Sequence, residues 1–222
     1  MSRVRQVAGG GRAVEVEPER LSGWFDRFAD RHGGVVRTER SPRRVVVHAS
    51  DGARAEVAVP FEPLATATGE VPGLAVEPLV THLLRPRRIG LVLVRLGGFS
   101  VGVAQGSRVV ASATDRRLVH GRHKAGGWSQ QRFARRREGQ ARQALRAAAD
   151  TVARVLLGTE LDAVVVGGDR GALDALRADP RLAELLDRAE PRVLDVGEPR
   201  RSVLDEAAAR ARCVEVVVVD PT

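Results

Sequence analysis

The residues best suited to chemistry lie in one short run from His120 to Arg132, which reads His-Gly-Arg-His-Lys-Ala-Gly-Gly-Trp-Ser-Gln-Gln-Arg. Gly126 and Gly127 permit backbone conformations closed to other residues and a close approach to a ligand. Ser129 is a good N-cap for a following helix. It leaves Gln130 in the first turn, near the unpaired amides and the positive end of the helix dipole. A neutral amide at that place can orient a water molecule with its oxygen and donate a hydrogen bond with its nitrogen.

The residues after Ser129 predict a long helix that continues to about Leu157 and stops at Gly158. At 100° per residue, its apolar side chains and its arginines fall on opposite faces. The apolar face comprises Ala141, Leu145, Ala148, Val152 and Val155. The basic face comprises Arg132, Arg135, Arg136, Arg142 and Arg146. We expect the apolar face to pack on a sheet, and the guanidinium groups to direct the glycine-glutamine element toward phosphates.

The positive charge of the chain is confined to this segment. The 222 residues have a formal net charge of +8, and residues 116–146 hold ten basic residues against one acidic residue, so the remainder is almost neutral. Such a cluster is typical of a site for a polyanion, although a solvated arginine-rich helix face has the same composition. The predicted RNA-binding residues are Arg116, Arg117, Arg122, His123, Lys124, Arg132, Arg135, Arg136, Arg142 and Arg146.

The rest of the composition excludes several classes of protein. A single cysteine, Cys213, excludes disulfides within the chain and a cysteine-cluster zinc site. No apolar run reaches the ~18 residues of a membrane span, and the N-terminal residues lack the hydrophobic stretch of a secretion signal. The absence of tyrosine and the scarcity of other aromatic residues argue against base-stacking platforms. We expect a cytoplasmic monomer with no membrane partner.

Residues 1–80 predict a small N-terminal α+β module followed by a proline-rich linker. A helix is expected over residues 14–32, with acid and proline at its start and Gly33-Gly34 at its end. Three short strands are expected at residues 35–39, 44–48 and 53–59. Residues 60–78 contain four prolines and no periodicity, which is typical of a linker. The compact part of the module therefore spans residues 13–60.

Residues 85–222 predict a second, larger domain. An antiparallel meander with glycine turns is expected from strands at residues 89–96, 99–105 and 108–113. After the long helix, helices at residues 171–189 and 202–212 alternate with strands at residues 161–166, 193–196 and 214–219. This order predicts a mixed sheet of the ribonuclease H-like kind. The fold class of the whole chain is therefore α+β.

In these features the chain resembles the Vms-like release factors, specifically their actinobacterial members, which are similar to the catalytic middle domain of eukaryotic and archaeal peptide-chain release factors. Those factors present a Gly-Gly-Gln loop, whereas the Vms-like group carries Gly-x-x-Gln, as in Gly127-Trp128-Ser129-Gln130. The likeness in element order covers residues 87–222. It implies hydrolysis of the ester between nascent peptide and tRNA on a stalled large ribosomal subunit. Peptidyl-tRNA and ribosomal RNA would be the partners, with no metal, nucleotide or other cofactor.

The resemblance assigns the catalytic role to Gln130, with Gly126 and Gly127 allowing entry and Trp128 and Ser129 shaping the tip. An ester needs a positioned water and a donor for the developing oxyanion, and a glutamine amide can serve both needs. The strict Gly-Gly-Gln is absent because Trp128 and Ser129 lie between the glycines and Gln130. No stop-codon-reading or GTPase-binding domain is recognisable. We therefore expect a codon-independent factor of ribosome rescue and quality control, without a GTPase partner.

Two other functions fit the same residues. One is metal-independent cleavage of the tRNA 3′ end, and the other is non-catalytic binding to the ribosome or to RNA. Two-metal ribonuclease chemistry needs clustered carboxylates, usually including one on the first strand. Residues 78–114 contain no Asp or Glu, so that position is empty.

Three weaker signals have structural explanations that we favour. His120 and His123 could bind a metal, but no acid or cysteine lies near them in sequence. Gly167-Gly168-Asp169 could be a phosphate turn but lacks the Walker lysine, so an ordinary strand-to-helix turn is expected. The aspartates near strand ends are expected to serve as caps and turn residues; they are Asp162, Asp169, Asp195 and Asp220.

Overall fold

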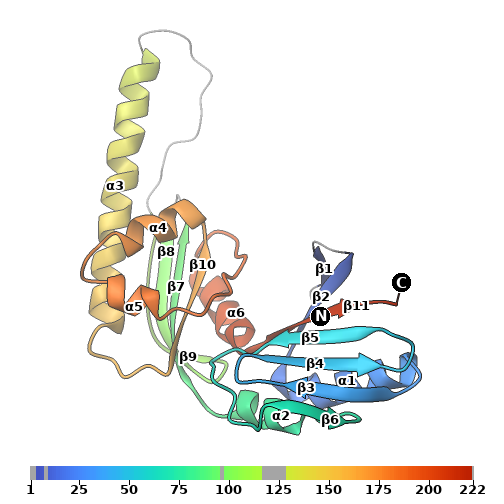
Figure 1. The fold of residues 1–222 in the computed structure, drawn as a ribbon. Helices are drawn as coiled ribbons and strands as arrows, with labels where there is room; N and C mark the ends of the chain where they lie inside the picture. Colours follow the sequence, from blue (N-terminus) through green and yellow to red (C-terminus); the bar gives the residue numbers. More distant parts are fainter. Residues whose placement is uncertain (1–3, 8–9, 96–97, 117–128, 222) are drawn as a thin grey trace. The chain divides into compact units, whose positions relative to one another are not determined.

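The computed structural model describes residues 4–7, 10–95, 98–116 and 129–221, without the side chains of residues 116 and 129–138. The chain divides into two compact units (Figure 1). The first contains residues 1–86 and 212–222, and the second contains residues 87–211. Both units combine helices with a β-sheet, which confirms the predicted α+β class. None of the helices in the described ranges is both long enough and apolar enough to cross a membrane.

The first unit is built on an antiparallel sheet with the strand order β1-β2-β11-β5-β4-β3-β6. Its strands are β1 (Val4–Val7), β2 (Gly11–Val16), β3 (Val35–Arg40), β4 (Arg44–Ala49), β5 (Arg54–Ala58), β6 (Gly69–Pro72) and β11 (Val214–Val219). Its helices are the 3₁₀ turn η1 (Pro18–Arg20), α1 (Leu21–Arg31) and α2 (Glu77–Leu84). Leu21, Phe25 and Leu79 on the helices join the sheet valines in one buried core.

Local elements of this unit depart from the prediction at two places. The helix expected from residue 14 begins at Leu21, because residues 11–16 form β2. Alternation over these residues places Val14 and Val16 against the core, and Pro18 then starts the 3₁₀ turn. The expected linker contains β6 and the start of α2, and Leu64 and Val76 within it are buried. Prolines in this stretch therefore mark the ends of short elements.

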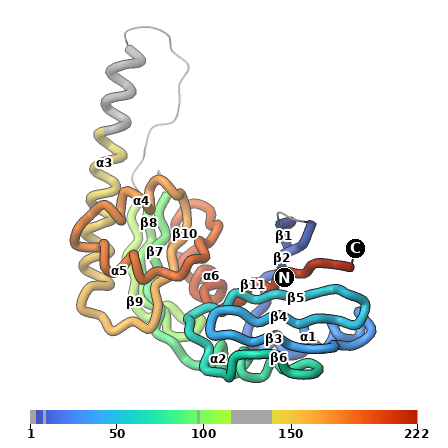
Figure 2. The backbone as a smooth tube through the Cα atoms, viewed as in Figure 1, coloured from blue at the N-terminus to red at the C-terminus, as the bar shows by residue number. Residues whose placement is uncertain are grey.

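The last strand of the chain belongs to the first sheet. The prediction groups residues 214–219 with the second domain, whereas β11 lies between β2 and β5 and pairs antiparallel with both (Figure 2). Val214, Val216 and Val218 face the core, and the residues between them are partly exposed. The sequence of residues 214–219 predicts a strand but does not reveal its neighbours, because those neighbours are distant in the sequence. Such a strand could join either sheet.

The second unit is built on a mixed sheet with the strand order β10-β7-β8-β9. The strands are β7 (Arg88–Arg95), β8 (Gly98–Gln105), β9 (Arg108–Arg116) and β10 (Ala163–Gly168). Strands β7, β8 and β9 form the predicted antiparallel meander, and β10 pairs parallel to β7. The mixed sheet expected from the sequence is thus confirmed.

Helices cover both faces of this sheet (Figure 1). They are α3 (Ser129–Leu156), α4 (Arg170–Arg177), α5 (Ala183–Asp187) and α6 (Arg201–Arg212). The first three share a core with Val92, Val101 and Val166, while Leu204 of α6 lies against Gly102 on the opposite face. The single helix predicted over residues 171–189 is two helices, with a turn at Asp179–Leu182 that contains a proline. The strand predicted at residues 193–196 is reduced to one parallel bridge between Leu194 and Gly167.

Candidate functional site

The predicted catalytic residues fall at and before the start of α3. Ser129 and Gln130 are the first two residues of this helix, and their side chains are outside the description. Gly126, Gly127 and Trp128 lie outside the described residues. Of the predicted RNA-binding residues, Arg117, Arg122, His123 and Lys124 also lie outside them, as does His120. The structure describes only the backbone of Arg116, Arg132, Arg135 and Arg136. Arg142 and Arg146 are therefore the residues of the basic face whose side chains are described.

All four strands of the second sheet reach the edge from which residues 117–128 depart. Arg116, the last residue of β9, is paired with Gly98 of β8, and Gly98 is paired in turn with Arg95 of β7. Gly168, the last residue of β10, is paired with Val94 of β7. The carboxyl ends of the parallel strands β7 and β10 therefore lie at the same sheet edge as the start of the basic segment. This edge is where ligands usually bind in sheets with parallel strands.

Helix α3 is anchored on the sheet by the face that the sequence predicts. Ala148 and Val152 are buried, and Leu145 and Val155 are partly buried against the same core. Among the residues whose side chains are described, Ala141 is the first of this face to be partly buried, and it lies twelve residues after the start of the helix. At 1.5 Å per residue, the preceding segment gives about 18 Å of helix. Packing of the second half of α3 therefore fixes the direction in which its first half carries Ser129 and Gln130.

The described arginines of the basic face are exposed and have no acidic partner among the side chains that the structure describes. Arg142 and Arg146 lie one turn apart on α3, and neither makes an ion pair or a side-chain hydrogen bond with the described residues. Arg181 differs, because its guanidinium binds both Asp150 and Asp179, which raises the pKa of Arg181. An arginine already held by carboxylates is a poor phosphate ligand. Arg142 and Arg146 are therefore available to a phosphate backbone.

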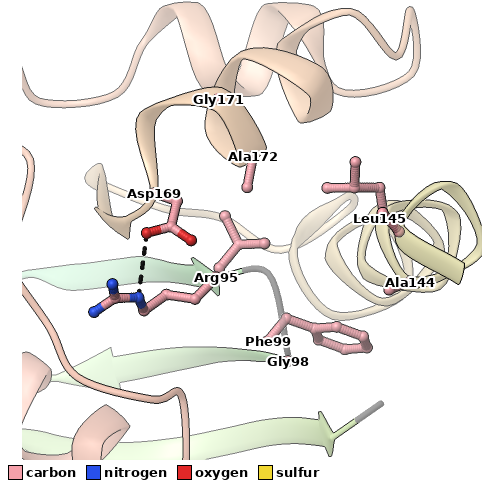
Figure 3. A pocket seen from close by; sticks show the side chains of 10 residues that line it. Arg95, Gly98, Phe99, Ala144, Leu145, Asp169, Gly171 and Ala172 are labelled. Atoms are coloured by element: carbon pink, nitrogen blue, oxygen red, sulfur yellow. Dashed lines mark ion pairs between the residues drawn. The ribbon is translucent and has the colours of Figure 1, made fainter. Parts of the chain in front are cut away.

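A cavity of about 300 Å³ lies beside α3 at the same sheet edge (Figure 3). Its wall is largely apolar and comprises Val94, Phe99, Ala141, Ala144, Leu145 and Ala172. The small side chains of Ala141 and Ala144 leave this space open between α3, α4 and the strand ends. Arg95 and Asp169 also line it and form an ion pair, with Nε of Arg95 3.2 Å from Oδ1 of Asp169. The sequence offered no signal for this cavity, because its walls come from four separate elements.

The Gly167-Gly168-Asp169 segment is an ordinary strand-to-helix turn, as expected. Gly168 has φ +108°, and a Cβ there would lie 2.0 Å from the carbonyl oxygen of Val94. A Cβ on Gly167 would lie 2.9 Å from the carbonyl oxygen of Leu194. Both glycines are thus required by close backbone approach between neighbouring segments.

Among the aspartates near strand ends, Asp162 and Asp220 make structural contacts through their carboxylates. Asp162 accepts a hydrogen bond from the backbone nitrogen of Arg88 at 2.6 Å, and Asp220 pairs with Arg12. The carbonyl oxygen of Asp195 accepts a hydrogen bond from Arg210. No group of three or more His, Cys, Asp or Glu side chains that could hold a metal ion occurs within the described ranges.

Comparison with protein families places the chain in the translation release-factor class. The chain belongs to the Actinobacteria/chloroflexi VLRF1 release factor family, which it matches over residues 87–217. This match contains the meander, α3 and the cavity. No curated protein matches the chain.

Three solved structures are distantly similar to the chain. An archaeal translation termination factor, aRF1, is 15% identical with a TM-score of 0.43, over 75% of this chain and 51% of that protein. Dom34 of S. cerevisiae, a translation termination-like factor, is 8% identical with a TM-score of 0.36, over 93% of this chain and 65% of Dom34. Pelota of Archaeoglobus fulgidus is 15% identical with a TM-score of 0.31, over 95% of this chain and 66% of Pelota. The chain thus spans about half the length of the archaeal termination factor.

Proposed function

We propose that this protein is a codon-independent release factor that hydrolyses the peptidyl-tRNA ester on stalled large ribosomal subunits. The observation that carries the proposal is the combination of the family match with α3. One end of that helix is packed on the sheet, its exposed arginines have no acidic partner among the described residues, and it begins at Ser129-Gln130. The ribosome and peptidyl-tRNA supply the phosphates that such a helix would bind.

The arginines of α3 position the protein, and they do so without reading sequence. Arg142 and Arg146 bind phosphate oxygens of ribosomal RNA or tRNA, and Arg132, Arg135 and Arg136 extend the same stripe toward the N-terminal end of the helix. Arg116, Arg117, Arg122, His123 and Lys124 contribute to the same interface from the segment before the helix. Because contacts of this kind carry no base information, the factor acts on stalled complexes regardless of codon.

Gln130 performs the chemistry at the ester. Its side-chain oxygen accepts a hydrogen bond from a water molecule and orients it toward the ester carbonyl carbon. A new carbon–oxygen bond forms, and the developing oxyanion receives a hydrogen bond from the amide nitrogen or from a backbone N–H. The bond to the ribose oxygen then breaks, and that oxygen takes up the proton that the attacking water loses. Gly126 and Gly127 give the segment access to the ester, and Trp128 and Ser129 shape its tip.

The proposal is tested with purified large subunits that carry peptidyl-tRNA and no small subunit or mRNA. The protein is added without nucleotide, and peptide release and the tRNA 3′ end are measured together. We expect release of the peptide and a tRNA with an intact 3′ CCA end. Dependence on a small subunit with a stop codon would contradict codon-independent action. A shortened tRNA would instead indicate an endonuclease, and binding without any product would indicate a non-catalytic module.

A further inference from the structure

The two sheets have four edge strands among the described residues, and three of these edges are short or covered. Strands β1 and β6 have four residues each. The outer edge of β10 is covered by residues 189–194, whose backbone forms hydrogen bonds with Val164, Val166 and Gly168 of that strand. Proteins commonly protect sheet edges in these ways, because an open edge can pair with a strand of another chain.

Strand β9 forms the fourth edge, and it is long and open. It has nine residues, and in the described part of the chain it pairs with β8 alone. Residues 109–114 make no backbone hydrogen bond with any other described residue. Alternate residues of an edge strand direct both backbone groups away from the sheet. The edge of β9 therefore presents N–H donors and C=O acceptors to a further strand.

The side chains along this edge do not block pairing. No residue from Val109 to Thr114 is charged, so the edge lacks the lysines that commonly prevent the addition of a strand. A β-bulge leaves Val110 without a partner on β8, and its side chain is 49% exposed. From Ala111 to Arg116 the register with β8 is regular. This part gives roughly 20 Å of strand on which an occupant can pair.

The two hydroxyl groups of the edge are bonded within the second unit. Oγ of Ser112 accepts a hydrogen bond from Arg201 of α6 at 2.8 Å. Oγ1 of Thr114 is 2.6 Å from Oγ of Ser100 on β8. The recognition that this edge offers is therefore backbone pairing, with selectivity supplied by the charges at its ends.

The two ends of the edge are positively charged. Arg108, the first residue of β9, is exposed and makes no ion pair or side-chain hydrogen bond with the described residues. At the other end, residues 116–124 contain four basic residues and no acidic residue. An occupant with acidic residues at both ends and an uncharged centre would match this distribution of charge.

The same charges disfavour a second copy of the chain as the occupant. If two β9 strands paired antiparallel about Ser112, the centre of the strand, Arg108 of each copy would lie opposite Arg116 of the other. Like charges that are directly opposite each other destabilise a sheet. Each copy also carries a formal net charge of +8, which adds to the repulsion.

We propose that the edge of β9 binds an extended peptide segment of another protein, which adds a fifth strand to the second sheet. The segment has uncharged, β-branched residues at its centre and acidic residues at its ends. Backbone hydrogen bonds supply the affinity. The acidic ends select the partner through attraction to Arg108 and to the basic residues within 116–124. The inference goes beyond the proposed function, because it concerns a protein partner and not the hydrolysis of the ester.

The test uses the full chain and a fluorescein-labelled peptide with the sequence Glu-Glu-Val-Thr-Val-Thr-Val-Glu-Glu. Fluorescence anisotropy measures binding, and hydrogen–deuterium exchange with mass spectrometry locates the peptide. We expect slower exchange of the backbone amides of residues 108–116 in the complex, with unchanged exchange in β1 and β6. The same peptide with N-methylated central amides should not bind, because it cannot donate hydrogen bonds to β9. A peptide with lysine in place of the glutamates should bind at least roughly threefold more weakly.

A matched pair of variants places the peptide on the edge. Ala111→Lys puts a charge on the edge and should weaken binding roughly threefold to fivefold. Ala175→Lys makes the same change at an exposed position of α4 and should retain wild-type binding. Circular dichroism verifies folding. If Ala111→Lys does not fold, Val110→Lys, at the exposed bulge, decides the test.

Several outcomes would overturn the inference. They are unchanged exchange in residues 108–116, binding of the N-methylated peptide, binding of the lysine peptide as tightly as the glutamate peptide, and wild-type binding by the folded edge variant. Sedimentation of the free chain as a dimer that Ala111→Lys dissociates would assign the edge to a second copy, and that result would overturn the inference as well.

Discussion

Val216 of β11 lies directly opposite Val57 of β5 in the antiparallel register, and both side chains are fully buried. Residues about 160 positions apart thus form a central pair of the first sheet. The adjacent strand β2 pairs with the other edge of β11, so that Val216 is also opposite Val14. The core of the first unit is therefore complete only when the last residues of the chain have joined it.

Shortening Val216 should destabilise the first unit. Val216→Ala removes two methyl groups from a fully buried site, so we expect a loss of about 2 kcal/mol in the free energy of unfolding. Val219→Ala, on the same strand but partly exposed, should cost much less. Urea denaturation followed by circular dichroism measures both. Equal effects of the two substitutions would contradict a buried position for Val216.

The sequence identifies most elements of this fold but not their long-range partners. The meander, α3 and the apolar face of α3 follow from glycine turns and from the spacing of Leu145, Ala148 and Val152, which are local signals. The membership of β11 in the first sheet does not follow, because the valines of residues 214–219 would fit either sheet. Helix α2 was missed because its first turn contains Pro78, the last of the four prolines that are typical of a linker.

The candidate site likewise has one part that the sequence predicts and one part that it does not. The basic face and the glycine-glutamine run are properties of one contiguous segment, so that the sequence alone predicts them. The cavity depends on Ala141 and Ala144 facing Val94 and Ala172 across α3, β7 and α4. Alanines on a helix carry no signal of an empty space, since the space depends on what the neighbouring elements leave unfilled.

Replacement of Gly168 should be far more costly than replacement of another glycine in the same unit. Gly168→Ala would place a Cβ 2.0 Å from a carbonyl oxygen at a φ of +108°, and we expect a loss of roughly 3 kcal/mol or more. Gly139 is in the interior of α3 with nothing within 4 Å of a Cβ, so Gly139→Ala should gain up to about 1 kcal/mol. Thermal denaturation compares the two. A mild effect of Gly168→Ala would contradict the tight turn after β10.

Acid should weaken the contribution of Asp51 to stability. Hydrogen bonds from the backbone of Ala53 and from the ring of the buried His32, whose Nδ1 is 2.8 Å away, lower the pKa of Asp51. Because the folded-state pKa lies below the unfolded value of ~3.9, this contribution is fully present above that value and is lost as the pH falls through the folded-state pKa.

The melting temperatures of the wild type and Asp51→Asn, measured from pH 6 to pH 2.5, test this linkage. The wild type should melt at a higher temperature than the variant at pH 6, and the difference should shrink below pH 4. Asp26→Asn, at an exposed position of α1, serves as the control and should give a small difference. A gap between the wild type and Asp51→Asn that stays constant with pH would contradict the role of the carboxylate.

Loss of either described arginine of the basic face, Arg142 or Arg146, should reduce the salt dependence of RNA binding. Arg142→Gln or Arg146→Gln removes one phosphate contact, and we expect the slope of log K against log salt to fall by roughly 0.7 to 1. Arg154→Gln, at an exposed position near the other end of α3, should leave the slope unchanged. Fluorescence anisotropy titrations with a labelled ten-nucleotide RNA of uridines at several salt concentrations measure these slopes. If Arg142→Gln, Arg146→Gln and Arg154→Gln all had the slope of the wild type, the RNA would bind away from the basic face.

The central claim is that Gln130 hydrolyses the ester from the start of an arginine-faced helix. It is tested most directly by the single-turnover rate of peptide release from large-subunit peptidyl-tRNA complexes, compared between the wild type and Gln130→Ala. Gln143→Ala, at an exposed position further along α3, serves as the control. Our account predicts a loss of at least roughly 100-fold for Gln130→Ala, with unchanged binding to the subunit and the wild-type rate for Gln143→Ala. Release at the wild-type rate by Gln130→Ala would contradict it.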